Sequence, residues 1–107
     1  MVTRSAEERF ASIAELELLV PGVTAGTGFG SNPGLRISAR IFAMVVSGEL
    51  VVKLPKGRVD ELVAAGVARR FDAGKGRPMK EWASVDVAMS RRWRALVREA
   101  RAFVGSR

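Results

Sequence analysis

Residues 35–54 constrain the fold more than any other stretch of the chain. Two runs rich in β-branched and other apolar residues, 35–46 and 49–54, are separated only by Ser47 and Gly48. A turn this short joins antiparallel strands, because parallel strands need a long crossover. The first run predicts two strand segments or one bent strand, and the second run predicts one further strand.

Three stretches have the apolar spacing of helices. The first opens with Ser5 and carries Glu8 three residues later, which is the spacing of a capping box. The last can be capped by Asp86 or by Ser90. We therefore predict helices over residues 5–19, 57–65 and 89–104.

Two short stretches after the second helix predict a β-hairpin. Residues 67–71 and 79–85 are separated by a loop that contains glycine and proline. Together with residues 35–54 they give the element order α-β-β-β-α-β-β-α within one domain, residues 1–107. Because most strand connections are short, we expect a mainly antiparallel, five-stranded sheet.

The chain contains no histidine, cysteine or tyrosine. It therefore lacks the side chain that titrates near neutral pH, the usual zinc ligands, and the usual bases for a nucleophile. We expect a protein that is not an enzyme and that has no metal site, no cofactor and no disulfide. The neighbouring carboxylates, Glu81 with Asp86 and Asp60 with Glu61, are interpreted as surface charges rather than acid–base pairs.

No apolar run approaches the roughly 20 residues that cross a bilayer. Residues 1–9 are polar and charged, unlike a signal peptide. We therefore expect a cytoplasmic protein that makes no membrane contact.

The run GTGFGS, residues 26–31, has a glycine at every second position. A dinucleotide-binding loop is followed by a helix, whereas here a predicted strand follows Gly34. We favour a bend beside the edge of the sheet, with Phe29 anchored in the core. A small-ligand or phosphate site at Gly26–Ser31 is the alternative.

Four blocks carry a resemblance to a known family: FGSNPGLRISARIFAM (29–44), ELVVKLP (49–55), GRPMKEWASV (76–85) and RRWRALVREARAFV (91–104). The chain resembles the TfoX N-terminal domain-like family, which is related in fold to YjbR-type proteins. The resemblance implies an α+β, two-layer sandwich with the helices on one face of the sheet, and it implies no catalytic residues. Where family members often have a glycine-containing turn, this chain has Ser38 and Ala39.

Positive charge is in excess, with 18 lysines and arginines against 11 acidic residues and a net charge of +7. Such a domain attracts polyanions. Two groups of cations are candidates for binding nucleic acid: a stripe on the last helix, Arg91, Arg94, Arg98 and Arg101, and a hairpin group, Arg69, Arg70, Lys75, Arg77 and Lys80. The alternative is that both groups are ordinary solvated charges.

The strand over residues 40–46 is apolar on both faces. Phe42, Met44 and Val46 are predicted to share one face, which a partner, such as a second copy of the chain, would cover. The alternative is that the sheet curls or that a helix wraps around it.

We expect a non-enzymatic binding or regulatory module that acts through protein contacts, including self-association. One alternative is a weak nucleic-acid-binding protein in transcription or competence regulation that uses its basic C-terminal helix. A second alternative is a small-ligand or phosphate binder.

Overall fold

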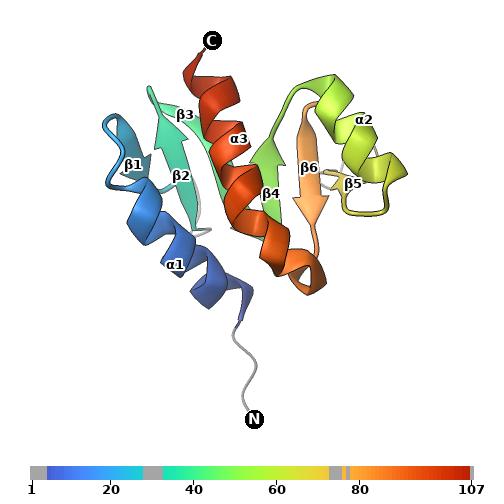
Figure 1. Cartoon of the computed structure of the whole chain (residues 1–107), viewed down its shortest axis with the longest axis horizontal. Helices are drawn as coiled ribbons and strands as arrows, with labels where there is room; N and C mark the ends of the chain where they lie inside the picture. Colours follow the sequence, from blue (N-terminus) through green and yellow to red (C-terminus); the bar gives the residue numbers. More distant parts are fainter. Residues whose placement is uncertain (1–4, 28–32, 73–75, 77, 107) are drawn as a thin grey trace.

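A computed structural model describes residues 5–27, 33–72, 76 and 78–106 (Figure 1). Within these residues there are three α-helices, a 3₁₀ helix and a six-stranded sheet. The elements in chain order are α1 (Ala6–Glu17), β1 (Val23–Ala25), β2 (Gly34–Ile37), β3 (Arg40–Val46), β4 (Glu49–Lys53), α2 (Lys56–Ala64), β5 (Arg69–Arg70), β6 (Trp82–Val85), η1 (Val87–Arg92) and α3 (Trp93–Gly105).

The strands lie in the order β1-β2-β3-β4-β6-β5, and every neighbouring pair is antiparallel. The predicted α+β class and antiparallel sheet are confirmed. The predicted count of five strands is wrong by one, because β1 pairs with β2 at the edge of the sheet. This strand has only three residues and lies in a glycine-rich segment, so it shows no alternating pattern.

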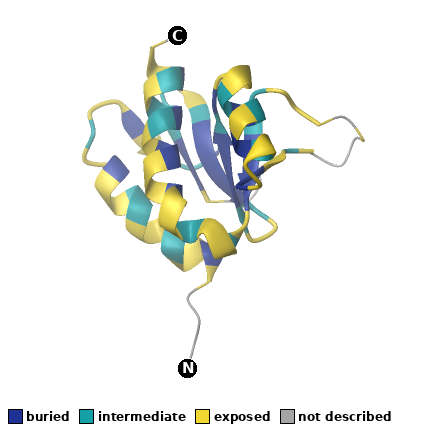
Figure 2. Ribbon diagram, turned by 45° about the vertical axis from the view of Figure 1, so that its right-hand side comes forward, coloured by how far each residue is buried: buried dark blue, intermediate teal, exposed yellow. Residues whose placement is uncertain are grey.

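All three α-helices lie against the same face of the sheet (Figures 1 and 2). The core forms between them and that face: Leu50, Val52 and Val85 of the sheet belong to one buried cluster with Trp93 and Leu96. Burial of these side chains supplies the main driving force for folding. Figure 2 shows the helices buried toward the sheet and exposed on their outer sides.

Helix boundaries follow the capping chemistry. The Glu8 amide donates to Ser5 Oγ at 3.1 Å and the Ser5 amide donates to Glu8 Oε1 at 3.4 Å, which confirms the predicted capping box of α1. The Ala88 amide donates to Asp86 Oδ1 at 2.8 Å, and this cap opens η1 rather than an α-helix. The last α-helix therefore begins at Trp93, later than predicted.

A β-bulge in β3 changes which side chains face the core. Leu35 pairs with Ala43, but Arg36 pairs with Ile41, so Phe42 is an extra residue on the longer strand. Phe42 is fully buried in the core cluster. The prediction that Phe42 shares a face with Met44 and Val46 is therefore wrong, because the bulge shifts the alternation of faces by one residue.

Two hairpins turn through positive φ at both central residues. The predicted turn between β3 and β4 is confirmed, with φ of 51° at Ser47 and 77° at Gly48. The turn between β2 and β3 uses Ser38 at 51° and Ala39 at 65°. Turns of this type match the twist of the strands, but non-glycine residues are strained in them.

Replacing Ala39 by glycine should stabilise the protein by about 0.5–1 kcal/mol, because glycine adopts positive φ without strain. Urea denaturation measures the change as a higher midpoint. The matched control is Ala11→Gly on the exposed side of α1, which should destabilise by about 1 kcal/mol. Equal losses of stability in both variants would contradict the strained turn.

Candidate functional site

The face of the sheet opposite the helices carries polar side chains. Strand pairing places Lys53 beside Trp82 and Val51 beside Ser84 on this open face. No helix of the described residues packs on it, yet Val51 is fully buried and Met44 is only 8% exposed. The open face therefore presents little of the apolar surface on which the predicted protein contact was based.

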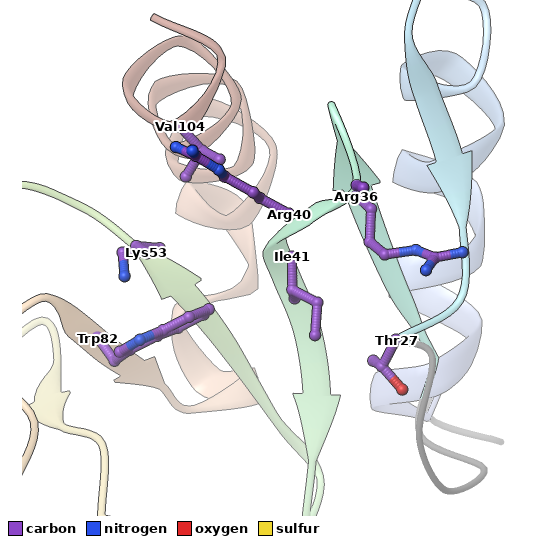
Figure 3. A pocket seen from close by; sticks show the side chains of 8 residues that line it. Thr27, Arg36, Arg40, Ile41, Lys53, Trp82 and Val104 are labelled. Atoms are coloured by element: carbon purple, nitrogen blue, oxygen red, sulfur yellow. The ribbon is translucent and has the colours of Figure 1, made fainter. Parts of the chain in front are cut away.

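A hollow of about 520 Å³ lies at one end of the open face, and Val104 of α3, on the helix side, also lines it (Figure 3). The pairing of β3 with β4 stops at Ala43 and Val52, so the β2–β3 hairpin diverges from β4 beyond that point. The hollow occupies the resulting gap between the two halves of the sheet. Its lining residues are Thr27, Arg36, Ala39, Arg40, Ile41, Lys53, Trp82 and Val104.

Among the described residues, three cations and no carboxylate line this hollow. In the described part of the chain, neither Arg36 nor Arg40 forms an ion pair, and Arg36 Nε is buried without a hydrogen-bond partner. Lys53 Nζ is 3.9 Å from Glu81 Oε1, a long contact between partly exposed groups that neutralises little charge. The hollow is consequently a positively charged concave surface, which attracts anions.

The Trp82 ring borders the hollow from β6. Lys53 Nζ lies 5.3 Å from the centroid of the indole, within the range of a cation–π contact. Trp82 and Lys53 also line a second hollow of about 470 Å³, together with Lys56, Met79, Lys80 and Glu81. The indole thus stands between two basic hollows and is accessible from both.

The other end of the open face is neutral. Arg69 donates to the Glu49 carboxylate, which also accepts from Ser84 Oγ at 2.5 Å. On the opposite, helix-covered face, Arg70 Nη2 is 2.6 Å from Asp60 Oδ1 of α2. These partners compensate two of the cations that the sequence predicted for nucleic-acid binding.

Asp60 is held ionised by two cations. Hydrogen bonds from Lys56, at 2.8 Å, and then from Arg70 lower the pKa of this carboxyl below its ordinary value. On α2, Arg58 donates to Glu99 of α3 at 2.9 Å, and this bond raises the pKa of the guanidinium. The carboxylates of α2 and α3 therefore serve to join elements on the helix side.

The predicted stripe on the last helix is divided by its contacts. Arg94 and Arg98 are exposed on α3, and Arg91 is exposed on η1. Arg101 instead donates from Nε to Glu17 Oε1 at 2.8 Å, where the Glu17 side chain is only 6% exposed. Arg101 therefore holds α3 against α1. Its guanidinium is engaged by Glu17, whereas Arg91, Arg94 and Arg98 are exposed to a ligand.

Several predicted site residues lie elsewhere. Lys75, Arg77, Phe29 and most of the glycine run fall outside the described residues. Gly26 has φ of 99°, and its amide donates to the Gly34 carbonyl at 2.7 Å, as expected of a bend. Lys80 is exposed at the second hollow.

The sequence did not single out Arg36, Arg40, Lys53 or Trp82. The spacing of Lys53 and Trp82 along the chain carries no signal, because only the pairing of β4 with β6 brings them together. Arg36 and Arg40 were visible as cations in an apolar strand region. They lie on opposite faces of the β2–β3 hairpin, because Arg36 pairs with Ile41 and Arg40 with Ile37, and only the gap beside β4 lets both line one hollow.

Comparisons with protein-family models, curated proteins and solved structures found no match for this chain. The resemblance to the TfoX N-terminal domain-like family stays a prediction. In the described residues, no helix has the length and apolar character to cross a bilayer, and no three metal-ligating side chains cluster together.

The Glu17–Arg101 contact predicts an asymmetry within the arginine stripe. Arg101→Leu should destabilise the protein by about 3 kcal/mol, because it leaves the Glu17 carboxylate buried without a partner. Arg98→Leu is the matched control and should change stability by less than about 0.5 kcal/mol. Thermal and urea unfolding measure both. Equal effects would mean that the contact with Glu17 contributes nothing.

Proposed function

We propose that the protein is a non-enzymatic binding module whose open sheet face takes an anionic ligand of the nucleic-acid type. One observation carries the proposal: Arg36, Arg40 and Lys53 line a hollow that is bordered by Trp82 and that has no carboxylate among its described lining residues. Arginine forks and lysine ammonium groups are the usual partners of phosphates. The net charge of +7 adds long-range attraction for a polyanion.

Binding is favoured over catalysis by the chemistry of the lining. Guanidinium and ammonium groups stay protonated at neutral pH, and neither threonine nor tryptophan serves as a base. The lining can therefore hold and orient an anion, but it offers no group that accepts a proton.

Self-association through the open face loses much of its support. Phe42 lies in the core, and Met44 is only 8% exposed. An interface between two copies through this face would also bring the cations of one copy's hollow close to those of the other copy's hollow. Such an approach is unfavourable without an intervening anion. The dimer, and the role in transcription or competence implied by the resemblance, remain predictions.

A second candidate surface is the outer side of α3. Arg94 and Arg98 are exposed there and form no ion pair among the described residues. A helix with such a ridge can contact the phosphates of a duplex. This surface lies on the helix side of the sheet, so the two candidates are separable by mutation.

The test compares two double variants that each remove two positive charges. Arg40→Gln with Lys53→Gln alters the open face, and Arg94→Gln with Arg98→Gln alters α3. Fluorescence anisotropy measures the affinity for a labelled oligonucleotide at low and near-physiological salt. We expect the open-face variant to bind about tenfold more weakly and with a shallower salt dependence, and the α3 variant to change less than twofold.

Equal losses in the two variants would show that binding follows net charge alone, which contradicts an open-face site. A loss confined to the α3 variant would assign the function to the second candidate surface.

A further inference from the structure

We infer that the open face selects single-stranded nucleic acid by stacking one base on Trp82. The inference rests on the proposed function and names its ligand more narrowly. Among the described residues, Trp82 is the aromatic side chain that lines the hollow of about 520 Å³, and it also lines the second hollow, of about 470 Å³. An aromatic ring among cations on an open sheet is the arrangement that holds unpaired bases, because every base has a flat π face.

The position of Trp82 between the two hollows supplies the geometry. Arg36 and Arg40 lie on one side of it. On the other side the hollow is lined by Lys80, by Lys56, which also donates to Asp60, and by Glu81. A strand whose base stacks on the indole would carry its flanking phosphates into these two basic regions. Lys53, which lies over the indole at 5.3 Å from its centroid, would contact the phosphate of the stacked nucleotide.

A duplex does not satisfy this arrangement. Its bases are stacked on one another inside the helix, so none reaches Trp82 without the cost of unstacking. The site is concave and bounded by the β2–β3 hairpin on one side (Figure 3), whereas a duplex presents a wide convex surface of phosphates. The helix ridge of Arg94 and Arg98 would be the surface for a duplex instead.

The apolar and polar parts of the larger hollow match a nucleotide. Ile41 and Val104 offer apolar contacts to a base or sugar edge, and Thr27 brings a hydroxyl from the start of the glycine run. Arg36 Nε is a buried donor without a partner in the described part of the chain, and a phosphate oxygen would satisfy it. A volume of about 520 Å³ lies within the range of pockets that hold ligands of this size.

The experiment compares four labelled probes of equal length: oligo(dT), oligo(rU), the matching DNA duplex and an abasic phosphodiester strand. The abasic strand carries the same phosphates without bases. We expect oligo(dT) to bind about tenfold more tightly than the abasic strand and more tightly than the duplex, in line with one stacked base. Comparison of the affinities for oligo(dT) and oligo(rU) shows whether the preferred single strand is DNA or RNA.

The variant that isolates stacking is Trp82→Leu, with Trp82→Phe as the conservative partner. Trp82→Leu should weaken oligo(dT) binding about tenfold and leave the abasic strand unchanged, while Trp82→Phe should keep most of the affinity. Wild-type protein gives an independent readout, because Trp93 is fully buried and Trp82 is partly exposed. Oligo(dT) should quench the intrinsic fluorescence, and the abasic strand should not.

Equal affinity for oligo(dT) and the abasic strand, with both weakened by Arg40→Gln and Lys53→Gln, would overturn base stacking and leave the proposed function intact. Tighter binding of the duplex than of oligo(dT) would also overturn base stacking and leave the proposed function intact. If no open-face variant weakened the binding of any probe, the proposed function itself would be overturned.

Discussion

The extra residue at Phe42 is the constraint on which the rest of the structure depends. It turns the Phe42 ring into the core and leaves Ile41 on the opposite face with Arg36. The ladder between β3 and β4 ends close to the bulge, at Ala43 and Val52. A bulge bends its strand and increases the local twist. The β2–β3 hairpin consequently diverges from β4, and the basic hollow lies where they separate.

The distribution of charge follows the same division of the molecule. Carboxylates on the helix side join elements: Glu17 binds Arg101 between α1 and α3, and Glu99 binds Arg58 between α3 and α2. At the hollow, the cations have almost no carboxylate beside them. Part of the excess positive charge therefore lies at one end of the open face, and another part lies on the outer side of α3 at Arg94 and Arg98.

Local signals in the sequence predicted the local structure well. The capping box at Ser5 and the turn at Ser47 and Gly48 were confirmed, because a few neighbouring residues determine each of them. The bulge was not predicted, since period-two alternation gives no sign of one extra residue. The candidate site was missed for the related reason that Lys53 and Trp82 meet only through long-range pairing of β4 with β6.

We propose that the open face, at the gap between β3 and β4, is the binding surface. Amide chemical-shift mapping by NMR during titration with oligo(dT) tests it most directly. If the ligand binds there, the largest shifts should occur at Arg36, Ile41 and Lys53 and at the Trp82 indole N–H. Shifts concentrated on α3 around Arg94 and Arg98, with the open face unchanged, would contradict it.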